Sequence, residues 1–188
     1  MRKKFAIIWI LIVAFSLTAL AGVVDDFANI MKGPGSFDFT AQVSGAGVNM
    51  TMKGSLAVEG KNVAVTMDLG GMKMKVISKD GASYMITDAQ KMIMKMPAGQ
   101  DATQGLQTDF SDLKKTGEGK GEVNGKTLPY EEYEIQGKKS KIYINDGKVY
   151  AIEGVEQGAK SLMIIENLKA GVPKGAFDFP AGYQKVGF

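Results

Sequence analysis

The chain has 188 residues, of which 45% are hydrophobic and 23% charged, which is enough for one domain with a hydrophobic core. The formal charge of +3 comes from 23 basic and 20 acidic residues, and the N-terminal Arg2, Lys3 and Lys4 account for it. The sequence contains no histidine and no cysteine, which excludes Ser-His-Asp and Cys-His catalysis, thiol redox chemistry and ordinary zinc sites.

Residues 1–21 have the organisation of a signal peptide. The three basic residues precede an apolar segment over 5–17, and Ala19-Leu20-Ala21 matches a small-residue cleavage site. The alternative is an uncleaved membrane anchor, for which the segment 5–21 is near the lower length limit. We expect cleavage before Gly22 and a single domain over 22–188.

The mature chain would be close to neutral, and all its basic residues would be lysines. Without arginine or a basic block, it has no signature of nucleic-acid recognition. No cysteine follows Leu20, so we expect no lipid anchor at the N-terminus. The sequence therefore predicts an exported protein, periplasmic or extracellular.

The first element expected after the signal is a short helix over 23–32, where apolar residues recur at helical spacing before Gly33-Pro34-Gly35. Turn signals then recur every eight to twelve residues, which is typical of an antiparallel meander. They predict strands at 36–44, 48–58, 63–69, 72–79, 83–87, 91–96, 119–123, 126–135, 139–145, 148–156 and 160–168.

The segment 97–117 interrupts this pattern. It is polar apart from Leu106, Phe110 and Leu113, whose spacings of four and three fit one side of a helix. We expect a loop and a short helix over about 106–115; the alternative is a linker without regular structure. The tail at 177–180 alternates again, and we expect no domain boundary.

Methionine gives the strongest indication of function. Seven of the twelve methionines lie between Met67 and Met96, and most alternate with lysine or a β-branched residue. Since strand side chains alternate between faces, these residues would share one face of a sheet. Methionine is flexible and polarisable and suits surfaces that fit variable apolar partners. Plain core packing is the alternative explanation.

Other chemistry has weaker support. The carboxylates Glu131, Glu132 and Glu134 are expected on a solvated strand face, and no twelve-residue calcium loop is present. Thioethers bind Cu(I), but Met92, Met94 and Met96 would stand about 6.6 Å apart and could not converge on one ion unaided. We therefore expect no enzyme activity, no metal and no cofactor.

The order of elements and two short segments resemble the LolA-like family of outer-membrane lipoprotein carriers and related lipid-binding envelope proteins. The segments are the strand Gly81–Ile86 with the following 88–96 hairpin, and Phe177-Asp178-Phe179-Pro180-Ala181-Gly182-Tyr183. The resemblance implies a mainly β (α+β) fold, a curved antiparallel sheet forming an incomplete barrel of about 11 strands, with short helices across its mouth. Lipoprotein carriers of the family use a cavity arginine, which the mature chain lacks.

Together these observations predict a monomeric, non-enzymatic carrier or sensor that binds a lipid or lipoprotein acyl chain, with a membrane-associated protein as a further partner. The alternative is an envelope interaction module with a fully packed core. The residues expected to line the cavity are Met50, Met52, Met67, Met72, Met74, Tyr84, Met85, Met92, Met94 and Met96, with Phe110 and Leu113 as lid contacts.

Overall fold

The computed structural model describes residues 23–45, 47–97, 114–135, 138–156 and 158–188. The expected signal peptide and the greater part of the expected helix at 106–115, with Phe110 and Leu113, lie outside these ranges. Within them, no helix is long and apolar enough to span a membrane.

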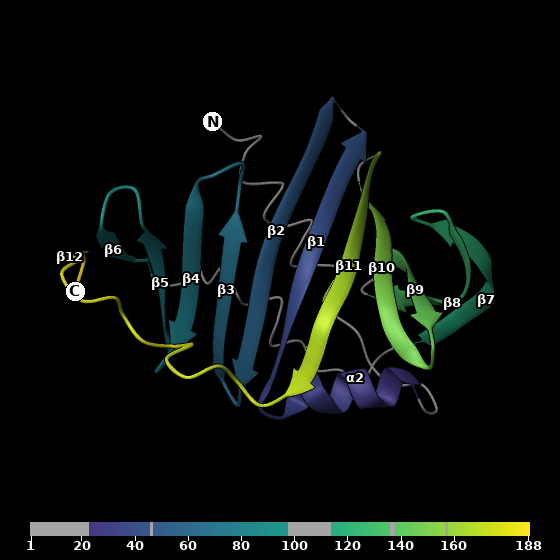
Figure 1. Ribbon diagram of the computed structural model, residues 1–188, viewed down its shortest axis with the longest axis horizontal. Helices are drawn as coiled ribbons and strands as arrows, with labels where there is room; N and C mark the ends of the chain where they lie inside the picture. Colours follow the sequence, from purple (N-terminus) through teal and green to yellow (C-terminus); the bar gives the residue numbers. More distant parts are fainter. Residues whose placement is uncertain (1–22, 46, 98–113, 136–137, 157) are drawn as a thin grey trace.

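In the described ranges, one open sheet of twelve strands makes up the fold, and the expected curved, mainly β architecture is confirmed (Figure 1). The strand order across the sheet is β12-β6-β5-β4-β3-β2-β1-β11-β10-β9-β8-β7. The strands are β1 (Gly35–Gly45), β2 (Val48–Glu59), β3 (Asn62–Asp68), β4 (Lys73–Lys79), β5 (Ala82–Thr87), β6 (Met92–Lys95), β7 (Lys114–Val123), β8 (Lys126–Ile135), β9 (Lys138–Asn145), β10 (Lys148–Glu156), β11 (Ala159–Ala170) and β12 (Gln184–Val186).

Antiparallel neighbours in sequence form two meanders, and β11 returns beside β1 to join them. Hairpin loops such as Asn124-Gly125 and Asp146-Gly147 have positive φ at both residues, as tight two-residue turns require. The predicted turns at these positions therefore set the register of the strands on either side.

The helix α2 (Val23–Lys32) has the predicted bounds and lies across one end of β1, β11 and β10 (Figure 1). Val24, Phe27 and Met31 form its apolar side and join the main buried cluster of the sheet. The Gly33 amide donates to the Asn29 carbonyl at 3.0 Å, which closes the last turn. The helix thus covers one end of a single sheet face.

Two sequence expectations about secondary structure need correction. The strand β7 begins at Lys114, so residues 114 and 115 are not the end of a helix. The tail also contributes β12, which pairs in parallel with β6, while residues 174–177 form turns. The Gln184 amide donates to the Lys91 carbonyl at 2.8 Å, so the tail pairs with the edge of the sheet.

Candidate functional site

The strand register brings the methionines onto one face of the sheet. Directly paired residues share a face, and Met67 stands opposite Met74 while Met85 stands opposite Met94. Ala41 lies between Met52 on one neighbouring strand and Met163 on the other. We call this surface the methionine face; its methionines are Met50, Met52, Met67, Met74, Met85, Met92, Met94 and Met163.

Burial changes along the methionine face. Near β1 the methionines are core residues: Met163 is 2% exposed and Met52 is 3% exposed. Toward the β6 edge, Met74, Met85 and Met94 are only partly buried. The face therefore has a packed half beneath α2 and a more accessible half over β4–β6.

Two predicted residues, Met72 and Met96, lie just beyond the ends of their strands, and a third, Tyr84, points to the other face. Met72 precedes β4 and is 60% exposed. Met96 follows β6, where its amide donates to the Ser83 carbonyl at 2.8 Å and continues the ladder. Tyr84 points to the opposite face, because it pairs with Ile77 and neighbours Met85 on the strand. We therefore leave Tyr84 out of the candidate site.

Other members of the methionine face were not predicted from the sequence. Met163, Ile165 and the rings of Phe37 and Phe39 are buried there. The Phe39 ring lies so close to Gly54 that a Cβ at Gly54 would come within 2.5 Å of it. The sequence predicted strands at 36–44 and 160–168, but only the β1–β11 pairing shows that these residues share one face.

The far end of the same face, at β7 and β8, is polar. The fully buried Tyr133 donates its hydroxyl to Glu131 at 2.8 Å, and Lys115 contacts Glu131 at 2.8 Å and Glu118 at 2.7 Å. The hydrogen bond to Glu118, followed by that to Glu131, raises the pKa of the Lys115 ammonium. The apolar surface thus ends in a charged network rather than in further methionines.

The opposite face of β2–β6 is covered by the C-terminal segment 171–188, and we call it the tail face (Figure 1). The Phe179 ring packs edge-on against Tyr84, with 4.8 Å between centroids, and Phe188 stacks on Tyr84 at 5.4 Å. The Lys79 ammonium donates to the Phe177 carbonyl and lies 4.2 Å from the Phe179 centroid. These contacts fix the strands of the methionine face from behind.

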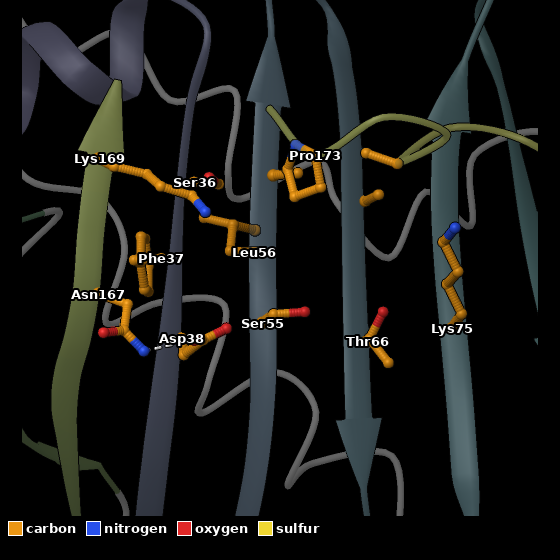
Figure 2. A pocket seen from close by; sticks show the side chains of 13 residues that line it. Ser36, Phe37, Asp38, Ser55, Leu56, Thr66, Lys75, Asn167, Lys169 and Pro173 are labelled. Carbon is orange, nitrogen blue, oxygen red and sulfur yellow. Dashed lines mark hydrogen bonds between the residues drawn. The ribbon is translucent and has the colours of Figure 1, made fainter. Parts of the chain in front are cut away.

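Two adjoining pockets open on the tail face and share Thr66 and Lys75: one of about 200 Å³, shown in Figure 2, and one of about 310 Å³. A third, of about 560 Å³, lies between α2 and the β9–β10 turn, against Phe27 and Val149. On the described residues, the methionine face is a partly exposed surface, and the enclosed cavity expected from the sequence stays a prediction.

No family model and no curated protein matches the chain. Among solved structures, an uncharacterized conserved protein from Thermus thermophilus is similar with a TM-score of 0.55 and 9% identity, over 86% of this chain and 94% of that chain. At this identity the likeness is one of fold. The open curved sheet is the architecture implied by the resemblance to the LolA-like family.

Two further solved structures are similar at a TM-score of 0.45. LprF from Mycobacterium bovis is 8% identical over 92% of this chain and 96% of that chain. MucB in the MucA/MucB complex of Pseudomonas aeruginosa is 18% identical over 86% of this chain and 62% of that chain. These similarities carry no conclusion about function, which must come from the residues themselves.

Proposed function

We propose that the protein is an exported, non-enzymatic carrier or sensor that holds the acyl chain of a lipid or lipoprotein on its methionine face. The observation that carries the proposal is the set of methionines on β11 and on β2–β6 that share one face, with those on β4–β6 only partly buried. The proposed contact residues are Met50, Met52, Met67, Met74, Met85, Met92, Met94 and Met96.

The choice of residue supports ligand binding over simple packing. Rigid cores favour leucine, isoleucine and valine, whose rotamers are well defined, whereas methionine adapts to the shape of its partner. The tail-face cluster of the same strands follows the first pattern with Ile77, Ile86 and Ile93. The same strands therefore carry a rigid aliphatic cluster on the tail face and an adaptable thioether surface on the methionine face.

The energetics are sufficient for useful affinity. Burial of an acyl chain contributes about 0.8 kcal/mol per CH₂, so a chain of about sixteen carbons would contribute roughly 12 kcal/mol. Association then costs at least about 4 kcal/mol. The mature chain lacks the arginine used by lipoprotein carriers of the LolA-like family, so release of the ligand would use another device, such as a membrane-associated partner.

The alternative is an interaction module with a packed interior. Its support is the burial of Met52, Met67 and Met163, each at most 6% exposed, within the main core cluster. For these three residues core packing and ligand contact predict the same side-chain position. The accessible half of the face, at Met74 and Met94, distinguishes the two hypotheses.

The test is native mass spectrometry of the mature protein purified from its own envelope. A carrier is expected to show a mass excess that disappears on denaturation and extracts as lipid. Uptake of a fluorescent fatty acid by the delipidated protein then compares Met74→Asp and Met94→Asp with Met72→Asp, because Met72 precedes β4 and its side chain is 60% exposed.

For a carrier, the first two variants lose uptake while the circular dichroism of the sheet is retained, and Met72→Asp behaves as wild type. A bare protein mass with no uptake of fatty acid or phospholipid would sink the proposal in favour of the packed module. Unfolding of both face variants would have the same meaning, since it would identify their sites as closed core.

A further inference from the structure

A row of polar side chains crosses the tail face beside the C-terminal segment. Asp38, Ser55, Thr66 and Lys75 are successive ladder partners on β1, β2, β3 and β4, so they project from the same face in one line (Figure 2). They line the pocket of about 200 Å³, together with small residues of the neighbouring row and Pro173 of the tail. A small groove with a row of polar side chains among apolar ones therefore lies on the side opposite the methionine face.

Lys75 closes one end of this groove and has an unusual environment for a lysine. It is partly buried and, among the described residues, makes no ion pair or hydrogen bond. Desolvation lowers the pKa of its ammonium; the charges of Asp178 and Asp88 oppose this in part, and that of Lys79 adds to it. Partial burial of an unpaired cation costs stability, which suits a group whose partner is a ligand.

Asp38 closes the other end, and the backbone beside it is irregular. The β1–β11 register shifts between Ser36 and Asp38, and Asn167 on β11 has a φ of 52°. The resulting bulge aims the Asn167 amide at Asp38, to which it donates at 2.8 Å. A neutral amide orients the carboxylate and leaves its negative charge uncompensated. No carboxylate–ammonium pair to Asp38 occurs within the described residues.

We propose that this groove binds a short zwitterionic peptide of two or three residues, with its C-terminal carboxylate at Lys75 and its N-terminal ammonium at Asp38. The backbones bearing these residues are three interstrand spacings apart, or about 14 Å. An extended tripeptide spans about 10 Å, which leaves room for a charge-assisted hydrogen bond at each end.

The middle of the groove suits a peptide backbone. The hydroxyls of Ser55 and Thr66 both donate and accept, as peptide N–H and C=O groups require. Ala57 and Ala64 line the groove beside them and leave space for a main chain, with no room made for large side chains.

The experiment is isothermal titration of the mature protein with trialanine and its two capped forms. Trialanine is expected to bind, and the C-terminal amide and the N-acetyl form are each expected to bind at least tenfold more weakly. In the protein, Lys75→Gln should reproduce the loss seen with the amide and Asp38→Asn the loss seen with the N-acetyl form. Lys53→Gln is the matched control, an exposed lysine of the same face in the next row.

The proposal is wrong if trialanine does not bind, or if Lys75→Gln binds it as tightly as wild type. Equal binding of the N-acetyl form would remove Asp38 from the site and contradict the zwitterion assignment. The lipid proposal stands or falls separately, because its variants change the other face of the sheet and its readout is fatty-acid uptake.

Discussion

The two faces of β3–β6 are built from the same strands and differ in nearly every property. On β4, Met74 and Val76 point to the methionine face, whereas Lys75 and Ile77 point to the tail face. The tail face is closed over Ile77 by the C-terminal segment and carries a polar groove beside it. The methionine face is mostly apolar, with Ser78, Ser83 and Thr87 as polar members on β4 and β5, and it is only partly buried at Met85 and Met94.

This contrast shows how strand alternation separates two tasks in one sheet. A rigid layer on one side allows the other side to remain adaptable, because the backbone is already held by the ladder and by the tail. The Tyr84 ring, clamped by Phe179 and Phe188, is part of that rigid layer. Ligand contact on the opposite side then need not contribute to folding.

The largest expected effect is on the closed side. Ile77 is 0% exposed, so Ile77→Ala should lower the free energy of unfolding by about 2–5 kcal/mol. Met85 is partly buried on the other side of the neighbouring strand, and Met85→Ala should cost well under half as much. Urea denaturation of both variants measures the difference. Equal losses would mean that the two faces are packed alike.

The packed half of the methionine face gives the next effect. A Cβ at Gly54 would come within 2.5 Å of the Phe39 ring and closer still to the Thr66 carbonyl. Gly54→Ala should therefore destabilise the protein by about 1–3 kcal/mol through overpacking. Gly117→Ala is the control, since its Cβ would meet Glu132 at an ordinary 3.7 Å. The melting temperatures of the two variants measure the difference. A Gly54→Ala variant as stable as wild type would show that the Phe39 ring and the β3 backbone can move to accept the extra methyl group.

The helix over 23–32, most strand positions and the shared methionine side could be predicted because each follows from a local period. The start of β7 could not be predicted in this way. Its glycines 117, 119 and 121 replace apolar alternation, and the Tyr130 and Tyr143 rings of the next strands occupy the space above Gly119 and Gly121. That packing depends on residues distant in the chain, as does the pairing of β12 with β6.

The two candidate sites differ in the same way. Methionines at alternate positions are visible along each strand. Tyr84 and Met85 are adjacent and must point to opposite faces, and the sequence alone did not show which of them lies on the methionine face. The groove is a row across strands, so Asp38 and Lys75 become neighbours of one site only through three successive registers. Alternation along one strand gives the face of each residue, but the row across strands also requires the exact register of three successive hairpins.

The bulge beside the groove gives a smaller expected effect. Asn tolerates the left-handed conformation better than most residues, and Asn167 has a φ of 52°. Asn167→Ala should cost about 1 kcal/mol or more of stability because it combines backbone strain with loss of the hydrogen bond to Asp38. Asn167→Gly keeps the backbone relaxed and should cost less. Chemical denaturation gives the free energy of unfolding of the two variants. A Gly variant less stable than the Ala variant would show that the backbone at residue 167 is not strained.

The smallest expected effect is a gain in stability and not a loss. Lys75→Gln removes a partly desolvated, unpaired charge and should raise the melting temperature by about 1–3 °C at neutral pH. Because the pKa of Lys75 is lowered in the folded state, its cost is fully present below the folded pKa and fades as pH rises toward the ordinary lysine value of 10.5. The advantage of Lys75→Gln over wild type should therefore shrink with rising pH, whereas Lys53→Gln should show no such trend. A stability loss in Lys75→Gln would assign Lys75 to the architecture of the tail face and leave the groove without its anion-binding end.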